Sequence, residues 1–475
     1  MKDYINMATE SYRQFDAGII SPQSIARDKI KSTSNSSVAF AYNVDFDDVM
    51  GYAVGRKGSD KVGSAISGAT DILGISSLRT FTSDIPVVAV NDGATADMYY
   101  WNGSAWVAST GWVNKGLGQH RFAQIGGSIF VVNGVNDMMS STNGSAWITT
   151  NCPIGIVFNY ITRYRGRLIA MTSNGTVYFS SIIDPAVSPF ITWTVATNFF
   201  RVNPDDGGYA SGFATVGNVL LIFKNNGFYR ADITNEFVQP DDLYQVGAIT
   251  QEAITVSQGM CFFYSGTTVY KTDGASYPIS IARAIQHYID LISNKSDVYM
   301  TSDEYFVYLE VGNIVIDNVT YSNVVFRYSL RNDSWTIYGY PFRVKQLFYN
   351  DKARKVYGGS VDSIYEIEGN YFNDDGTSIP YKVIFQELDG GMRGMTKHIK
   401  DNIAIYSKYA TGSNITIQNN DGKSDQVSIV SDYKVARPFN IDGNWFTVSW
   451  SGVIGNKRPI FEGLDLFYEN KGIRK

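Results

Sequence analysis

Cysteine and histidine are scarce in this 475-residue sequence, which has two cysteines and three histidines. Cys152 and Cys261 lie far apart and fit no metal-binding or redox spacing, so we expect both to be reduced, small apolar side chains. His120, His287 and His398 are scattered, and no His-Glu-x-x-His motif occurs. The sequence therefore gives no support for a zinc hydrolase, and we expect neither a resident metal nor a cofactor.

Excess positive charge and long apolar runs are also missing. The formal net charge is -5 and charged residues make up 18% of the chain. No basic field indicates tight binding of nucleic acid, although a surface that only lets DNA slide past does not require one. No window approaches about 18 consecutive apolar residues, and the first ten residues lack an apolar signal core. We expect no membrane span, no export, and a protein made and kept on the cytosolic side of the cell.

Glycine and aromatic residues are abundant, which favours strands and tight turns over helices. The phrase Asn-Gly-Ser-Ala-Trp occurs at 102–106 and again at 143–147, 41 residues later. Weaker copies follow at 173–178, 224–229 and 264–270. Strands and Asn/Gly turns that repeat every 40 to 45 residues or so are typical of propeller blades. The sequence therefore predicts a β-propeller of about six to eight blades, with seven as the best estimate.

The flanking segments do not carry this phrase. Residues 1–75 read as an N-terminal arm with platform strands, 76–370 as the propeller, and 371–475 as six strands separated by loops. We therefore predict a mainly β protein, in which the propeller is inserted between N- and C-terminal segments that together form a β platform or sandwich. One helix is expected within the propeller, at 280–293, because Ala282, Ile285, Ile289 and Ile292 share one face and Ser280 offers an N-cap.

The first 60 residues contain a recognisable pattern. An aromatic-x-x-Gly arm, an Asn-apolar-x-aromatic strand, a glycine turn and Arg-x-Gly follow one another; the matching residues are Phe15, Gly18, Asn43, Phe46, Gly51, Arg56 and Gly58. This pattern resembles the opening of the tail nozzle proteins of short-tailed bacteriophages, also called tail tubular protein B or packaged-DNA stabilisation proteins. Two positions depart from it: Ala17 stands where the family often has glycine, and Lys57 where it often has proline.

The resemblance implies a structural virion protein with no enzymatic activity. It implies assembly in the host bacterial cytoplasm as a ring homo-oligomer, with a hexamer expected, below the portal and its adaptor protein. Such a ring lines the DNA exit channel, retains packaged double-stranded DNA without sequence specificity, and anchors tail fibres or spikes. The seven matching residues are then expected to serve structure and assembly.

A carbohydrate-binding or glycoside-hydrolysing propeller is the alternative. Residues 141–147 resemble the Asp-box of sialidase propellers without its aspartate, and Arg163, Arg165 and Arg167 are expected to share one face of a strand. No Gly-x-Ser-x-Gly motif occurs and no catalytic residue is predicted. Asp205-Asp206 and Asp374-Asp375 lack the spacing of a calcium loop, so we interpret both pairs as turns.

A glycine-rich basic loop at 390–400 carries Arg393, Lys397 and Lys400. If it projects into a channel, these three cations are candidates for contact with DNA phosphates. A solvated surface loop is the other interpretation of the same stretch.

Overall fold

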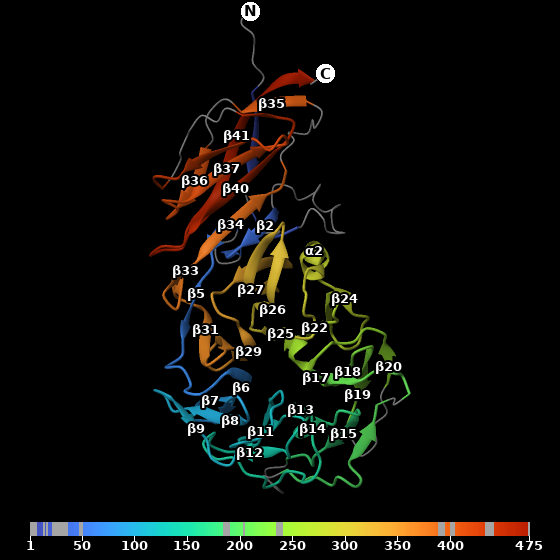
Figure 1. Cartoon of the computed structure of the whole chain (residues 1–475). Coiled ribbons are helices and arrows are strands. Elements are labelled where there is room, and N and C mark those ends of the chain that lie inside the picture. Colours follow the sequence, from blue (N-terminus) through green and yellow to red (C-terminus); the bar gives the residue numbers. More distant parts are fainter. Residues whose placement is uncertain are drawn as a thin grey trace, which may run out of the picture.

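The computed structural model describes residues 7–12, 15, 18–20, 37–46, 51–183, 191–202, 205–233, 241–387, 395–399, 404–432 and 441–473. It confirms the predicted fold class: a mainly β protein with a propeller inserted between N- and C-terminal segments that form a β platform (Figure 1). The propeller lies at one end and the platform at the other, and β2 (Val38–Tyr42) lies at the junction between them.

Seven blades are formed within the described residues. The first four are β6 (Asp71–Arg79), β7 (Asp84–Asn91), β8 (Ala96–Trp101) and β9 (Trp106–Ala108); β10 (Arg121–Ile125), β11 (Ser128–Val132) and β12 (Met139–Ser141); β13 (Tyr160–Tyr164), β14 (Arg167–Met171), β15 (Thr176–Phe179) and β16 (Phe199–Arg201); β17 (Ala210–Val216), β18 (Val219–Lys224), β19 (Gly227–Ala231) and β20 (Asp241–Tyr244). A bridge between Ser140 and Ile148 extends the second blade.

The remaining three blades lead back to the platform. They are β21 (Ile254–Ser257), β22 (Met260–Tyr264), β23 (Val269–Thr272) and β24 (Ile279–Ser280); β25 (Tyr299–Ser302), β26 (Phe306–Ile316), β27 (Val319–Ser329) and β28 (Ser334–Gly339); β29 (Lys345–Asn350), β30 (Lys355–Ser360), β31 (Ser363–Gly369) and β5 (Gly58–Lys61). Each inner strand contacts the next, and β29 contacts β6, so the ring is closed. The fourth strand of blade seven, β5, comes from the segment before blade one.

The platform draws its strands from both ends of the chain. They are β1 (Met7–Tyr12), β2, β3 (Val44–Asp45), β4 (Ala53–Gly55), β34 (Pro380–Phe385), β35 (Met395–Ile399), β36 (Ala404–Lys408), β37 (Asn414–Asn419), β38 (Ser424–Ser428), β39 (Ile441–Gly443), β40 (Phe446–Val453) and β41 (Ile460–Ile473). Between the propeller and these strands, β32 (Asn373–Asp374) and β33 (Thr377–Ser378) extend the sheet of blade seven beyond β5. The long strand β41 pairs with β1, β4, β35 and β36. Strand β2 pairs with β28 of blade six and with β34, which joins the propeller and the platform in one nine-stranded sheet.

Apolar packing follows the blade boundaries. Separate clusters of buried side chains fill the spaces between blades one and two, two and three, three and four, four and five, six and seven, and seven and one. A larger cluster connects blades five and six with the platform strands. Each blade thus packs chiefly on its neighbours, as expected for a repeat architecture, and only blades five and six share their core with the platform.

The structure moves one predicted boundary: the propeller begins before residue 76. Strand β5, at 58–61, belongs to blade seven, and β6 of blade one begins at Asp71, whereas the sequence predicts that residues 1–75 belong to the N-terminal arm and platform. The reason is ring closure. The fourth strand of the last blade is supplied by residues that lie next to it in space but precede the propeller in the chain.

The predicted helix at 280–293 is much shorter than expected. The structure has strand β24, a 3-10 turn η2 (Arg283–Ile285) and a five-residue helix α2 (Gln286–Asp290). Ser280 pairs with Tyr270 of β23, so its backbone is extended and it does not cap the helix. The apolar spacing nevertheless marked the buried face correctly, since Ala282, Ile285 and Ile289 are buried.

The repeated turn phrase corresponds to two different turns. In blades one and two, Asn102 and Asn143 each accept hydrogen bonds from the backbone N–H groups two and three residues later, in the turn after the third strand. The weaker copies near Asn174, Asn226 and Gly266 lie instead between the second and third strands of blades three to five. Asn-Gly sequences suit any tight hairpin, so they mark a turn without specifying which one.

Candidate functional site at the junction of propeller and platform

Asn43 lies where the chain passes from β2 to β3, and it connects three parts of the fold. Its φ of 56° is in the left-handed region, which asparagine tolerates better than most residues. The side-chain Oδ1 accepts hydrogen bonds from the backbone N–H of Gly339 at 2.8 Å and from Nε of Arg56 at 2.8 Å. Its Nδ2 donates to the carbonyl of Pro380 at 2.7 Å. One amide therefore joins blade six, β34 and the segment leading to β5.

Arg56 is the centre of this junction and is completely buried. Its Nη1 and Nη2 donate to the two carboxylate oxygens of Asp374, at 2.9 Å for Nη1. They also donate to the carbonyls of Lys57 and Gly339, at 2.8 and 2.7 Å. The guanidinium lies over the Tyr340 ring, 4.3 Å from its centroid. All five N–H groups of the guanidinium are thus engaged, in the bidentate arrangement that suits arginine and a carboxylate.

The charge state of Arg56 follows from these contacts. Burial by itself lowers the pKa of the guanidinium, but Tyr340 and Asp374 raise the pKa above its usual value. Asp374 also accepts a hydrogen bond from Ser59 Oγ at 2.8 Å. The guanidinium is therefore charged, and both partners of the buried pair have further hydrogen bonds, which a buried ion pair needs in order to persist.

Two glycines of the same pattern allow close backbone approach. A Cβ at Gly58 would lie 2.1 Å from the carbonyl oxygen of Asn373, so no other residue fits without moving the backbone. Gly18 has a φ of 62°, and a Cβ there would lie 2.7 Å from Cβ of Ser334. Both positions bring the N-terminal segment against chain from the second half of the protein.

The remaining pattern residues contribute packing. Phe15 and Phe46 are completely buried in the core shared by the platform and blades five and six. The Phe15 ring lies 5.5 Å from that of Phe385 and 5.9 Å from that of Phe461, and its backbone N–H donates to the carbonyl of Gly51 at 3.1 Å. All seven residues of the predicted pattern thus lie in the junction or in the core beside it. Their expected role in assembly remains a prediction.

A second buried charge cluster beside Arg56 was not predicted. Arg327 of β27 is completely buried, with Nη1 3.2 Å from Asp45 and Nε 3.5 Å from Glu368. Burial raises the pKa of Glu368 to about 7, although Arg327 opposes this. The sequence did not predict this cluster. Its charged residues alternate with apolar residues along their strands, and that pattern predicts a strand with one face exposed to solvent. Strand β27 is covered on both faces here, so Arg327 is buried like its neighbours Phe326 and Tyr328.

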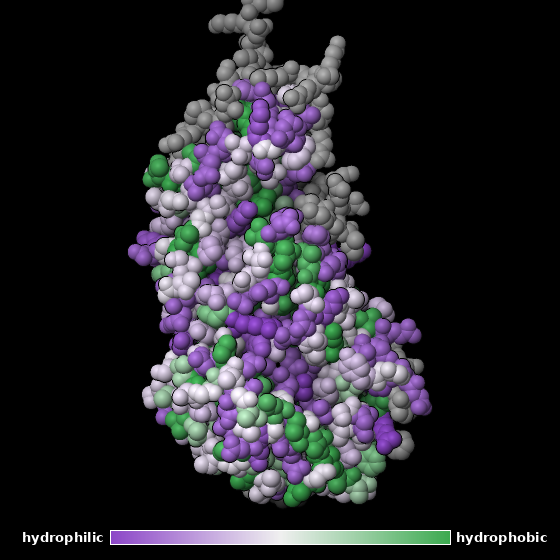
Figure 2. All heavy atoms as spheres, viewed as in Figure 1, coloured by the Kyte–Doolittle hydropathy of each residue, from purple (hydrophilic) through white to green (hydrophobic). Residues whose placement is uncertain are grey.

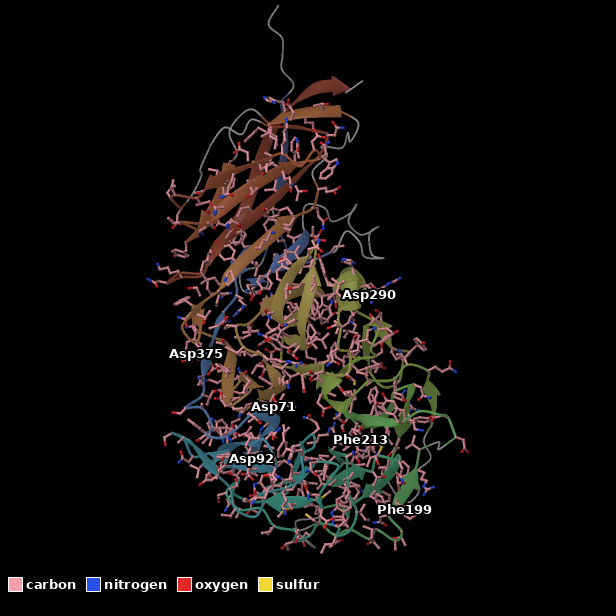
Figure 3. All side chains as sticks on the ribbon, viewed as in Figure 1. Asp71, Asp92, Phe199, Phe213, Asp290 and Asp375 are labelled. Carbon is pink, nitrogen blue, oxygen red and sulfur yellow. The ribbon has the colours of Figure 1, made fainter. Side chains whose placement is uncertain are left out.

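The axis of the propeller is crossed by an ion pair. Arg121 of blade two donates from Nε and Nη2 to the two carboxylate oxygens of Glu252, at 2.7 and 3.0 Å, and Glu252 immediately precedes blade five. These blades lie across the ring from each other. Asp71 of blade one, labelled in Figure 3, forms another inter-blade ion pair, with Lys345 of blade seven at 3.0 Å. Hydrophilic residues gather over the middle of the ring (Figure 2), and the Arg121–Glu252 pair obstructs passage along the axis.

The basic loop is not a row of three projecting cations. Lys397 lies on β35 and is 1% exposed, and its Nζ donates to the carbonyl of Asn444 at 2.9 Å. The expectation that Lys397 is available to DNA is therefore wrong, because pairing of β35 with β39 and β41 places it inside the platform. Arg393 and Lys400 lie outside the described residues.

The arginine row expected to line a groove does not form one either. Arg165 has a φ of 43° and lies in the turn between β13 and β14, where it pairs with Asp232 at 2.6 Å. Arg167 is buried and its guanidinium lies 5.4 Å from the Phe179 ring centroid, while Arg163 is exposed. Arg163 is on β13, Arg165 is in the turn and Arg167 is on β14. The three side chains therefore do not share one face of a strand and do not converge on one ligand.

In each of the pairs Asp205-Asp206 and Asp374-Asp375, at least one aspartate forms an ion pair within the fold. Asp206 forms an ion pair with Lys224 at 2.6 Å, and Asp374 belongs to the junction. Among the residues that the structure describes, no group of three or more His, Cys, Asp and Glu side chains is placed to hold a metal ion. In the same part of the chain, no helix has the length and apolar character needed to cross a membrane.

Comparisons with known proteins give a likeness to propellers only. No family model and no curated protein matches the chain. Among solved structures, BamB from Moraxella catarrhalis aligns at 9% identity and a TM-score of 0.40, over 66% of this chain and 97% of that one. The WD40 propeller domain of Doa1 aligns at 11% identity and a TM-score of 0.41, over 65% and 96%. The extracellular domain of BT4673 from B. thetaiotaomicron aligns at 12% and 0.44, over 90% and 62%. At such TM-scores the matches carry no functional argument, and the fold assignment depends on the strand pairing itself.

Proposed function

We propose that this protein is a structural component of a phage tail: a nozzle or hub that assembles as a ring, with six copies expected, below the portal and its adaptor protein. The ring lines the exit channel for DNA, retains the packaged genome and offers its propellers as attachment points for tail fibres or spikes. It is a virion protein assembled in the bacterial cytoplasm, and its role is mechanical rather than enzymatic.

One observation carries the proposal. Both ends of the chain are built into a single platform around β41, and the propeller is a lobe inserted between them. This arrangement suits a ring subunit, because the platform is free to contact neighbouring copies while the propeller stands out as a rigid body. The resemblance supports the same interpretation, since its residues, including Asn43 and Arg56, lie where the lobe joins the platform.

The obstructed propeller axis is consistent with this role. Because Arg121 and Glu252 meet across the ring, the conduit in this proposal lies between copies of the platform, not through the propeller. The net charge of -5 also suits a wall along which DNA slides without being held.

The test is assembly. Purified protein, alone and mixed with candidate portal and adaptor proteins from the same source, is examined by mass photometry. We expect a species with the mass of six copies of the 52.7-kDa chain that joins the portal–adaptor complex. Negative-stain images of that complex should show an axial ring with outward lobes. Monomers that never join the complex, or activity against glycans, would overturn the proposal.

A further inference from the structure

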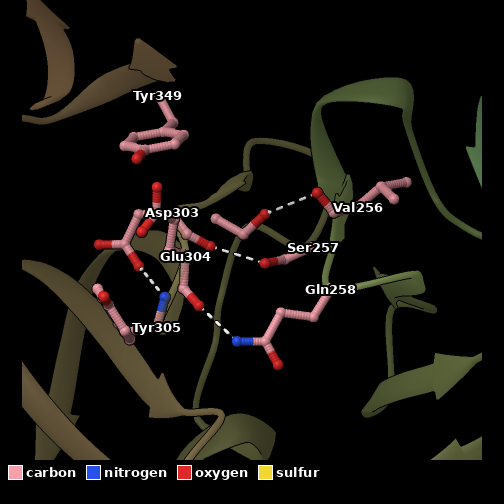
Figure 4. Close-up of a pocket in the computed structure, with 8 residues that line it drawn as sticks. Val256, Ser257, Gln258, Asp303, Glu304, Tyr305 and Tyr349 are labelled. Carbon is pink, nitrogen blue, oxygen red and sulfur yellow. Dashed lines mark hydrogen bonds between the residues drawn. The ribbon is translucent and has the colours of Figure 1, made fainter. Parts of the chain in front are cut away.

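A cavity of about 350 Å³ opens on the propeller where the turns of three blades meet. One wall is the end of β21 and the residue after it, with Val256, Ser257 and Gln258, and the opposite wall is the end of β25 and the turn after it, residues 302–305. Tyr349 of β29 closes a third side (Figure 4). The cavity is far from the junction in sequence and belongs to none of the contacts described above.

The walls of this cavity are fixed in place. Ser257 Oγ donates to the carbonyl of Asp303 at 2.7 Å, and Gln258 Nε2 donates to the carbonyl of Glu304 at 2.5 Å (Figure 4). The Asp303 carboxylate accepts from the backbone N–H of Tyr305 at 2.7 Å and from the Tyr308 hydroxyl at 2.9 Å. Asp303 is thus committed to its own loop, and the site is preformed, which lowers the cost of ordering on binding.

The groups left open to a ligand are aromatic and acidic. Tyr305 is 59% exposed and the Glu304 side chain 43%. Two carboxylates, those of Glu304 and Asp303, lie beside the Tyr349 hydroxyl; after burial they are the main causes that raise its pKa, while Arg354 lowers it. A ligand that fits must combine positive charge with a flat face.

The protein itself already brings a guanidinium to this carboxylate. Arg354 Nε lies 3.7 Å from Glu304 Oε1, and the Arg354 side chain is 75% exposed. An ion pair this exposed is screened by water and is weak. The pair shows that the Glu304 carboxylate is accessible to a guanidinium. Because the contact is weak, a guanidinium from another protein can displace Arg354.

We propose that this cavity binds an arginine side chain of a partner protein. A guanidinium is planar, stacks on tyrosine faces and pairs with a carboxylate through two parallel hydrogen bonds, so it uses Tyr305, Tyr349 and Glu304 together. Lysine lacks the flat face, and a neutral sugar gains nothing from the charge of the carboxylate. The inference depends only on this face of the propeller and is independent of the proposed ring.

The probe is a five-residue peptide, acetylated and amidated, with a central arginine between glycine and serine. Its binding to the full-length protein is measured by saturation-transfer-difference NMR. A citrulline peptide, which keeps the shape and removes the charge, is the matched ligand. We expect the arginine peptide to bind at least fivefold more tightly than the citrulline peptide. Equal binding of the two peptides, or no binding of either, would overturn the proposal.

Variants locate the binding. Glu304→Gln and Tyr305→Ala should each weaken arginine binding at least threefold, whereas Asp205→Asn, at an exposed turn outside the cavity, should leave it unchanged. Arg354→Ala should strengthen binding about twofold, because it removes the competing guanidinium, an effect that a purely structural role would not produce. The altered side chains at 304, 305 and 354 are exposed, so unchanged thermal unfolding is expected and serves as the folding check. Binding that is equal in Glu304→Gln and the native protein, or a neutral oligosaccharide bound more tightly than the peptide, refutes the inference.

Discussion

Replacement of Arg56 by methionine should separate the contribution of the junction from that of the rest of the fold. Methionine keeps much of the apolar stem of arginine but removes every N–H group of the guanidinium. Asp374, whose side chain is 3% exposed, then keeps only the hydrogen bond from Ser59 among the contacts described here. A carboxylate left buried without its cation is the costly outcome of breaking a buried ion pair.

The expected loss can be estimated from the contacts. Removing one partner of a buried, hydrogen-bonded ion pair costs about 3 to 5 kcal/mol. The carbonyls of Lys57 and Gly339 and the Oδ1 of Asn43 also lose a donor, each worth at most about 1 kcal/mol. Retained packing by methionine offsets part of this sum. We therefore expect Arg56→Met to lower the free energy of unfolding by about 4 kcal/mol.

The assay is urea unfolding followed by tryptophan fluorescence, with limited proteolysis of the native state to detect separation of propeller and platform. Asp375→Asn is the matched control. Its partner Lys61 lies 3.6 Å away with both side chains about a third exposed, so a loss of at most about 1 kcal/mol is expected. The double variant Arg56→Met, Asp374→Leu should regain most of the stability, because no charge is left buried. If Arg56→Met costs no more than Asp375→Asn, the reasoning is wrong.

Three further outcomes are expected. Burial raises the pKa of the Glu310 carboxyl, on β26, from 4.5 to about 7, although Arg343 opposes this. The folded state keeps this proton to higher pH than the unfolded chain, so this group lowers the free energy of unfolding by roughly 3 kcal/mol as the pH rises from 4.5 to 7. Glu310→Gln should remove this part of the slope in pH-dependent urea unfolding and leave the part that Glu368 contributes. Glu252→Gln should weaken the contact with Arg121 and lower the free energy of unfolding by about 2 kcal/mol, whereas an unchanged urea midpoint would contradict a role in closing the axis. Gly58→Ala should destabilise the protein by more than about 2 kcal/mol, because its Cβ meets the Asn373 carbonyl; calorimetry checks this, and a tolerated alanine would refute the close approach.

The sequence predicted features that depend on residues close together in the chain. Alternating strands, Asn/Gly turns and the number of blades follow from local propensity and from a repeat period, and these were confirmed. The same local reasoning failed at 280–293, where pairing of Ser280 with Tyr270 overrides a helical pattern. It also failed at Lys397, since strand pairing within the platform buries a lysine that looks solvated in the sequence.

The sequence by itself thus determined the type of secondary structure and its spacing: strands that repeat blade by blade and are joined by glycine-containing turns. Tertiary structure alone decided the junction, because Arg56 and Asp374 are 318 positions apart and neither signals its partner. It also decided that β5 completes the last blade and that Arg121 meets Glu252 across the axis. A charge is stable in a protein interior only when its counter-charge arrives beside it, and that meeting depends on how distant segments pack rather than on any short stretch of sequence.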